Sequence, residues 1–283
     1  MILYDPNLKV CRIKIFLTFT LCFFFRPNSV IMPSRYSFRL VFVAISILCL
    51  FASCSPAQKI EKAVANPSAV TKLNLSRSGL SKLPPTIQKL ENLEELILFK
   101  NRIDSLPPWI GQLGKLKKLV ISSNRLRAIP PEIGQLEKLE YLAVKFNEMD
   151  SLPSEIGQLK NLKYLDLQYN NLEKLPQEIG DLESLEFIYL NHNQLYAIPP
   201  EIGQLSNLKQ LHIGRNFLSF LPVEIGLLNN LNELDIAGSG PLLDVPESIA
   251  NLRSLDVIYI DQTTILPYTV TMLRNRTRII MRY

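Results

Sequence analysis

The sequence predicts an α/β solenoid, in which short parallel strands form one curved sheet on the concave face and irregular or helical turns form the convex face. Two observations predict this fold class. A phrase of 23 residues recurs from Val70 to Ser254, and repeats of this length stack as supersecondary units. Within each copy, leucines alternate with polar or aromatic residues, which is the pattern of a strand that is buried on one face.

The cleanest copy reads LKYLDLQYNNLEKLPQEIGDLES, from Leu162 to Ser184. Successive copies open 23 residues apart at Leu93, Leu116, Leu139, Leu162, Leu185 and Leu208. We number the positions of each copy as slots from this leucine, and count the copy that opens at Val70 as the first. Slots 4 and 6, which are Leu165 and Leu167 in the fifth copy, fall on the buried face of the strand. Aliphatic residues of neighbouring copies then stack into one continuous core.

The strand has to end in a turn, where slot 9 holds the same residue in six copies. These residues are Asn101, Asn124, Asn147, Asn170, Asn193 and Asn216. A buried Asn side chain can satisfy turn backbone groups that no sheet hydrogen bond reaches, so we expect a structural asparagine ladder. Slot 15 is proline in the first seven copies, which suits an extended or helical-turn segment outside the sheet.

The phrase LxxLxLxxNxLxxLPxxIGxL resembles the leucine-rich repeat superfamily, in the 23-residue LPxxIGxL type, and the chain is similar to bacterial leucine-rich repeat lipoproteins. The resemblance covers about Val70 to Leu266. It implies a right-handed horseshoe whose concave parallel sheet binds proteins or peptides, and it implies no reaction.

The ends of the chain depart from the repeat. We expect a leader over 1–53, a tether and amino-terminal cap over 54–69, eight repeats over 70–254, and a degenerate repeat with a carboxy-terminal cap over 255–283. The segment from Lys59 to Pro67 predicts a short cap helix that stops before proline. The eighth copy carries one extra residue between Gly238 and Pro241.

The leader holds two apolar stretches, Ile15 to Phe25 and Leu40 to Ala52, each shorter than the roughly 20 residues of a membrane-spanning helix. The second follows Arg35 and Arg39 and closes as FASC. This layout indicates a secretory signal and resembles the lipobox of bacterial lipoproteins. We therefore expect translation to start at Met32, lipid to attach at Cys54, and the protein to lie in the bacterial cell envelope. A membrane anchor made of both stretches, and a cytoplasmic scaffold with a spurious leader, are the alternatives.

The charge divides the chain. Residues 1–53 hold six Lys or Arg and one Asp, while residues 54–283 hold 25 bases and 25 acids. Residues 178–261 have three bases against 12 acids, which argues against nucleic acid as a partner. The arginines from Arg274 to Arg282 predict a solvated cap, with contact to an anionic surface as the alternative. All four cysteines precede the repeats, so the solenoid can hold no disulfide and no thiolate metal site.

The repeats show no motif for catalysis, for a metal or for a cofactor. His192 and His212 both fall on the expected concave face, but the strand geometry separates their Cα atoms by roughly 11 Å. That distance is too long for an obvious shared zinc site or for a nucleophile and its base. We expect no enzyme, no cofactor, no metal and no small-molecule substrate.

Slot 2 alternates in charge through Glu94, Lys117, Glu140, Lys163, Glu186 and Lys209. Opposite charges on neighbouring strands stabilise their pairing by about 0.2 to 1 kcal/mol each. The pattern predicts a ladder of ion pairs that fixes the register of the strands.

Aromatic residues gather in the central copies of the expected concave face. Slot 3 gives Tyr141, Tyr164 and Phe187, and slot 8 gives Phe146, Tyr169 and His192. Tyr189 lies between these columns, with Lys145, Asp166 and Gln168 as polar neighbours. Amphipathic rings with a charged rim are typical of binding hot spots. The rings, together with His212, predict a site for a protein or peptide, while mutual stacking alone and glycan binding are the alternatives.

Overall fold

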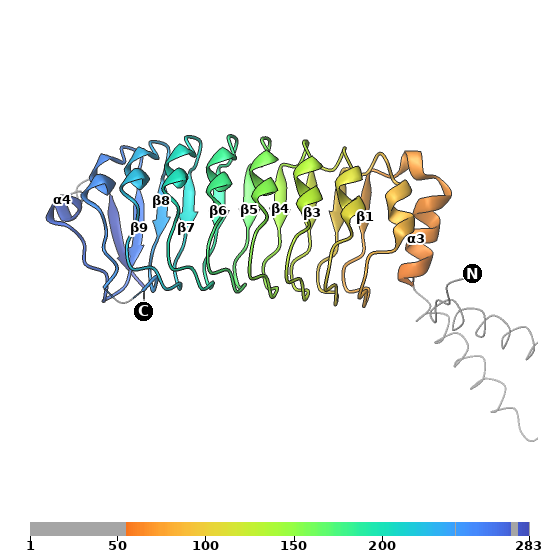
Figure 1. Cartoon of the computed structure of the whole chain (residues 1–283), viewed down its shortest axis with the longest axis horizontal. Helices are drawn as coiled ribbons and strands as arrows, with labels where there is room; N and C mark the ends of the chain where they lie inside the picture. Colours follow the sequence, from red (N-terminus) through yellow and green to blue (C-terminus); the bar gives the residue numbers. More distant parts are fainter. Residues whose placement is uncertain (1–54, 241, 273–276, 283) are drawn as a thin grey trace, which may run out of the picture. The chain divides into compact units, whose positions relative to one another are not determined.

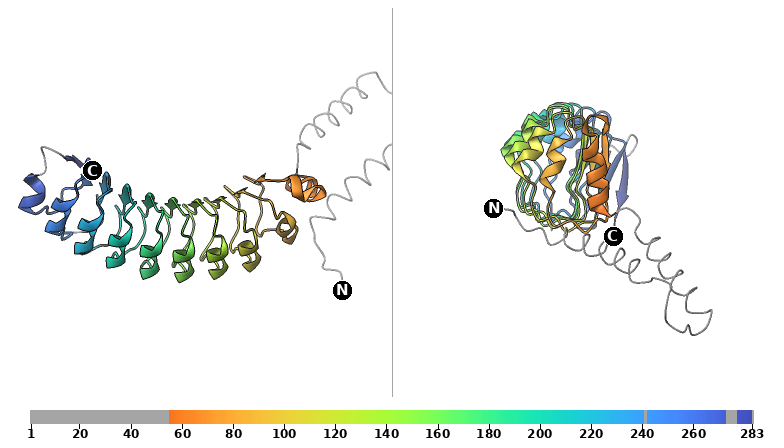
Figure 2. Two further views of the ribbon diagram at one scale, coloured as in Figure 1. Left: turned by 90° about the horizontal axis from the view of Figure 1, so that it is seen from above. Right: turned by 90° about the vertical axis from the view of Figure 1, so that its right-hand side faces the viewer.

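The computed structural model describes residues 55–240, 242–272 and 277–282. These residues form a solenoid whose ten strands make one parallel sheet in sequence order, β1 to β10. The strands line the inner face of the coil, and short helical turns line the outer face (Figure 1 and Figure 2). The predicted fold class is confirmed.

Each of the eight copies contributes one short strand to the sheet, and two further strands follow them. The strands are β1 Lys72–Asn74, β2 Glu95–Ile97, β3 Lys118–Val120, β4 Tyr141–Ala143, β5 Tyr164–Asp166, β6 Phe187–Tyr189, β7 Gln210–His212, β8 Glu233–Asp235, β9 Val257–Ile260 and β10 Arg278–Met281. Partners in β1 to β8 are 23 residues apart, as in the pairing of Leu142 with Leu165. Equivalent slots therefore lie side by side across the sheet.

A 3₁₀ helix follows the strand of each copy on the outer face. These helices are η2 Pro85–Lys89, η3 Pro108–Gln112, η4 Pro131–Gln135, η5 Ser154–Gln158, η6 Gln177–Asp181, η7 Pro200–Gln204, η8 Val223–Leu227 and η9 Glu247–Asn251. Each begins directly after a proline, which holds an extended backbone before the turn. A Cβ added at Gly180 would lie 2.5 Å from the carbonyl oxygen of Glu201. Glycine in this slot therefore lets η6 and η7 pack closely.

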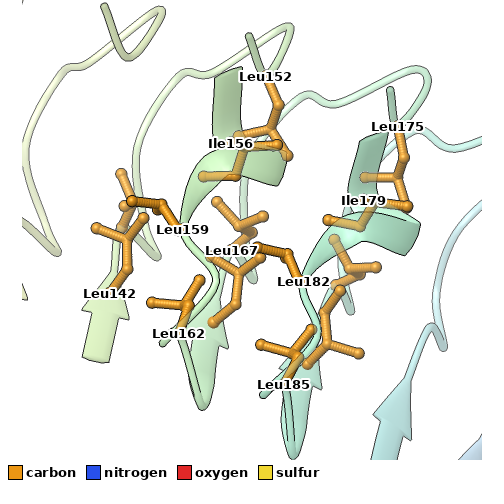
Figure 3. Packing of buried hydrophobic residues seen from close by; sticks show 14 of the residues in the cluster. Leu142, Leu152, Ile156, Leu159, Leu162, Leu167, Leu175, Ile179, Leu182 and Leu185 are labelled. Carbon is orange, nitrogen blue, oxygen red and sulfur yellow. The ribbon is translucent and has the colours of Figure 1, made fainter. Parts of the chain in front are cut away.

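The core is a continuous column of aliphatic side chains between the sheet and the helical turns. Leu165 and Leu167 are fully buried, as are Leu172, Ile179 and Leu182. Figure 3 shows how Leu162, Leu167 and Leu182 pack between neighbouring copies. Removal of this apolar surface from water is the main contribution to the stability of each copy.

The amino-terminal cap is the helix α3 Pro56–Ala65, followed by η1 Pro67–Ala69. It begins three residues before the predicted Lys59. Ser55 and Gln58 form a capping box, and Pro56 occupies the first helical position, where its missing N–H costs nothing. Ile60 and Ala63 join the core, so these residues pack against the solenoid.

The carboxy-terminal end contains a strand that the sequence analysis did not predict. After α4 Tyr268–Thr271, β10 pairs in parallel with β9. Arg278 is exposed, whereas the Arg282 guanidinium binds the Asp235 carboxylate and lies 3.6 Å from the centre of the Tyr259 ring. The Arg282 side chain is 45% exposed, so it is both solvated and paired with a buried carboxylate, and the sequence did not predict this pairing. Arg274 and Arg276 are outside the described residues.

Three predictions also fall on residues outside those that the structure describes, namely the leader, the translation start at Met32 and the lipidation of Cys54. Within residues 55–240, 242–272 and 277–282, no helix has the length and apolar character needed to cross a membrane.

Candidate binding face

The first column of rings crosses strands β4 to β7 on the concave face. Tyr141 and Tyr164 stack with centroids 4.2 Å apart and planes inclined by 4°. Tyr164 also contacts Phe187 at 6.3 Å and Tyr189 at 5.3 Å. His212 meets the Tyr189 ring at 4.8 Å in an edge-on arrangement. Five of the predicted site residues therefore form one connected ring surface.

The second column lies in the turns that follow the strands. Phe146, Tyr169 and His192 stack at 4.3 Å and 4.0 Å. All three have left-handed backbone, with φ of 55°, 55° and 58°, and slot 8 is left-handed in the other copies from Arg77 to Arg215 as well. The slot 8 side chains of successive copies therefore point in the same direction, and for this reason the three rings stack.

Asp166 is a buried carboxylate rather than part of a charged rim. Its side chain is 1% exposed and pairs with Lys145 Nζ at 3.1 Å. The backbone N–H and the Nε2 amide of Gln168 donate to it at 3.3 Å and 3.2 Å. Burial raises the pKa of the neighbouring Tyr164 hydroxyl, and the Asp166 charge raises it further. Tyr164 therefore stays protonated and available as a donor.

A hollow of about 660 Å³ adjoins the columns at the carboxy-terminal end of the concave face. Tyr169, His192 and His212 border it, whereas Tyr141, Phe146, Tyr164, Phe187 and Tyr189 do not. Slot 7 holds Gly214 and Ala237 in the seventh and eighth copies, and slot 8 of the eighth copy holds Gly238. An added Cβ at Gly214 would lie 2.7 Å from the Ala237 carbonyl oxygen. This change from large to small residues is the sequence signal that could have located the hollow.

The floor of the hollow is a second buried carboxylate, Asp235, which is 1% exposed. Arg282 neutralises it, Asn191 Nδ2 donates to it at 3.0 Å, and the Ala237 N–H donates at 3.2 Å. Among the described residues, Asn191 Oδ1 is a buried acceptor without a hydrogen-bond partner. Because a buried acceptor is costly to leave unpaired, the hollow suits a ligand that brings a donor. Sequence reasoning missed Asn191, Asp235 and Arg282.

His212 is held between carboxylates. Its Nε2 lies 3.1 Å from Glu233 Oε1, without the alignment of a hydrogen bond. Burial lowers the pKa of His212, while Asp235 and Glu233 oppose that effect. Burial also lowers the pKa of His192, and the nearby Arg215 contributes to the same shift. Both imidazoles are therefore neutral at pH 7.

The predicted charge ladder is interrupted. Ion pairs join Glu94 with Lys117 at 3.1 Å, Glu140 with Lys163 at 2.9 Å and Glu186 with Lys209 at 2.6 Å. Each of these side chains pairs with one of its two neighbours in slot 2, so the described residues form three separate pairs instead of a continuous ladder. All three pairs are partly exposed, so each contributes little to stability.

The six asparagines of slot 9 bind the turns. Asn170 Nδ2 donates to the Leu167 and Val144 carbonyl oxygens at 2.9 Å and 3.2 Å, and its Oδ1 accepts from the Met149 N–H at 3.2 Å. Asn101, Asn124, Asn147, Asn193 and Asn216 make equivalent contacts. Their amides join each copy to the preceding one.

A stacked coil of this kind, with one strand, one asparagine turn and one outer helix per copy, defines a leucine-rich repeat solenoid. The family model for a leucine-rich repeat region matches residues 21–149 and 153–219. The chain therefore belongs to the leucine-rich repeat family. No curated protein sequence matches it significantly.

Three solved structures show what the chain is similar to. A leucine-rich repeat protein of Leptospira interrogans is 34% identical over 79% of this chain, with a TM-score of 0.67. The ectodomain of the receptor kinase GASSHO1/SCHENGEN3 from Arabidopsis thaliana, solved with Casparian strip integrity factor 2, is 32% identical over 77%, with a TM-score of 0.65. The plant peptide hormone receptor RGFR1, solved with RGF2, is 27% identical over 76%, with a TM-score of 0.62.

The chain spans 63% of the Leptospira protein, 28% of the GASSHO1/SCHENGEN3 chain and 42% of the RGFR1 chain. The fold is that of a protein-binding repeat module, and the plant neighbours were solved with their ligands bound. Leucine-rich repeat proteins are in general binding modules without enzymatic activity.

Proposed function

We propose that this protein is a lipid-anchored component of the bacterial cell envelope that captures an extended protein or peptide segment on its concave face. The observation that carries the binding role is the connected ring surface of β4 to β7, which adjoins a hollow with a polar floor. Rigid amphipathic rings offer large contact area at low entropic cost, and a hollow beside them can receive an anchoring side chain.

The arrangement of the rings favours a peptide over a glycan. In the second column, both faces of the Tyr169 ring are covered, by Phe146 on one side and His192 on the other. Sugars stack on open aromatic faces, whereas the exposed edges and hydroxyls of such a column suit the side chains and backbone of a peptide. The unpaired Asn191 Oδ1 adds an acceptor for a backbone or side-chain N–H.

The anchor rests on the sequence of the leader, with its basic start, apolar stretch and final FASC motif. Helix α3 begins at Pro56, so a lipid on Cys54 would lie close to the amino-terminal cap along the chain. The solenoid would then be held near the membrane surface through this end.

The binding role is tested with the double variant Tyr164→Ala/Tyr169→Ala of the full chain. Loss of a hot spot costs about 2 kcal/mol or more, which is roughly thirtyfold in affinity. We expect capture of its partner from crosslinked envelopes, and selection of peptides from a displayed library, to fall by about that factor.

Tyr268→Ala is the matched control, because Tyr268 is an exposed tyrosine on α4, outside the concave columns. It should retain binding, and thermal melts should show that both variants stay folded. If the double variant bound with wild-type affinity, the ring columns would have only a structural role. If the wild type selected sugars instead of peptides, the glycan alternative would be favoured.

A further inference from the structure

A second surface carries residues that differ from the repeat pattern. It lies on the flank of the solenoid, formed by the segment that joins the asparagine turn of each copy to its outer helix. Phe217 and Phe220, in slots 10 and 13 of the seventh copy, are 53% and 50% exposed. Tyr196 in the sixth copy packs against Phe217 with ring centroids 6.1 Å apart. Leu242 in the eighth copy is exposed as well.

The other copies provide an internal comparison for these positions. Slot 10 is polar in copies two to six, as Arg102, Arg125, Glu148, Asn171 and Gln194. Slot 13 holds Ser105, Ala128, Ser151, Lys174 and Ala197 in the same copies. The fold therefore does not require a phenylalanine at either position, and contiguous exposed apolar residues of this kind mark an interaction surface.

Two charged residues lie on either side of the apolar residues, at equal distances along the solenoid from the boundary between the sixth and seventh copies. Lys174 lies in slot 13 of the fifth copy, and Asp244 lies at the same level in the eighth copy, where its backbone bridges to Phe220. Both side chains are exposed, and within the described residues neither has an ion-pair partner. The flank thus has a cation at one end and an anion at the other.

We propose that this flank joins two copies of the chain in a two-fold symmetric dimer. A two-fold axis normal to the flank, passing between the sixth and seventh copies at the level of slot 13, exchanges the fifth copy with the eighth and the sixth with the seventh. This axis places Lys174 of each chain opposite Asp244 of the partner chain, so the dimer contains two such pairs.

The same operation sets each exposed phenylalanine against a smaller residue. Phe220 of the seventh copy falls on Ala197 in the sixth copy of the partner, and Phe217 falls on Pro200. Ala197 and Pro200 are both exposed, so a ring of the partner can reach each of them. Shape and charge are therefore both self-complementary under a single axis, which is what an isologous interface requires.

Charge reversal with rescue tests this dimer in the full chain, by sedimentation equilibrium in a density-matched detergent. Lys174→Asp and Asp244→Lys should each raise the dimer dissociation constant by about tenfold or more, because each places like charges opposite one another at two symmetric contacts. The double variant Lys174→Asp/Asp244→Lys should restore the wild-type constant to within about threefold, because it re-forms both pairs in the opposite sense.

Arg102→Asp is the matched control, since it reverses an exposed cation on the same flank outside the interface, and it should leave the constant unchanged. Phe220→Asp should give a monomer whose melting temperature equals that of wild type measured well below the dimer dissociation constant, where wild type is monomeric too. A monomeric wild type throughout the micromolar range overturns the proposal, and so does a double variant without rescue. A monomer that floats with lipid vesicles through Phe220 would assign the flank to a membrane surface instead.

Discussion

The imidazole of His212 lies between the Tyr189 ring and two carboxylates on the concave face. Burial lowers its pKa from the ordinary value of 6.5. The unfolded chain therefore binds a proton at this group more readily than the folded protein does. The free energy of unfolding should fall as the pH drops below 6.5 and should level off once the pH passes the folded pKa.

Imidazole NMR titration of His212 and urea melts between neutral and acidic pH check this expectation. His212→Gln should flatten the pH dependence, while the part due to His192 remains, because its pKa is lowered too. A folded pKa at or above 6.5 for His212 would mean that Glu233 and Asp235 outweigh burial.

Leu165 shows what a single core position contributes. Its side chain is fully buried in β5, in register with Leu142 and Ile188. Leu165→Ala should lower the free energy of unfolding by about 2 to 5 kcal/mol, because it removes apolar burial and leaves a cavity.

Glu173→Ala, an exposed change in the same copy, should stay within about 0.5 kcal/mol. Urea denaturation of both variants gives the comparison, and equal midpoints would contradict the assigned strand register.

At the scale of elements, β10 closes the carboxy-terminal end of the sheet, and the residue that follows it supplies a charge to the hollow. Arg282 is the cation that neutralises the buried Asp235 carboxylate. Arg282→Ala should cost about 1 to 3 kcal/mol, because it leaves a buried acceptor without its charged donor. Hydrogen exchange should localise the loss to β9 and β10.

Arg278→Ala, in β10, is the control, because Arg278 is exposed and takes part in none of the ion pairs of the described residues. Adding Asp235→Asn to Arg282→Ala should recover part of the loss, since the neutral amide needs no cation. If Arg282→Ala and Arg278→Ala behave alike, the ion pair does not hold the end of the solenoid.

At the scale of the whole molecule, the proposed lipid anchor would determine where the concave face meets its partner. Cys54→Ser should move the protein from the detergent phase to the aqueous phase and abolish incorporation of labelled fatty acid, because the FASC motif supplies the one acylation site that we propose. Binding of the selected peptide should stay unchanged. A wild type without label, found in the cytoplasmic fraction, would favour the regulatory scaffold.

The sequence by itself determined the architecture, because a strict 23-residue period leaves one way to stack the copies. It also placed the ring columns, since slots 3 and 8 of neighbouring copies must lie side by side. The family resemblance then gave the expectation of protein binding, and the leader that of an anchor.

Tertiary structure decided what depends on contacts between copies or on departures from the repeat. The hollow arises where the small residues Ala237 and Gly238 stand in slots 7 and 8, and it is completed by Arg282, which follows β10 outside the repeat. Asp166 and Asp235 look like surface carboxylates in the sequence, but neighbouring side chains bury them. The period fixes where each backbone segment lies, whereas burial and charge pairing depend on which side chains meet in space.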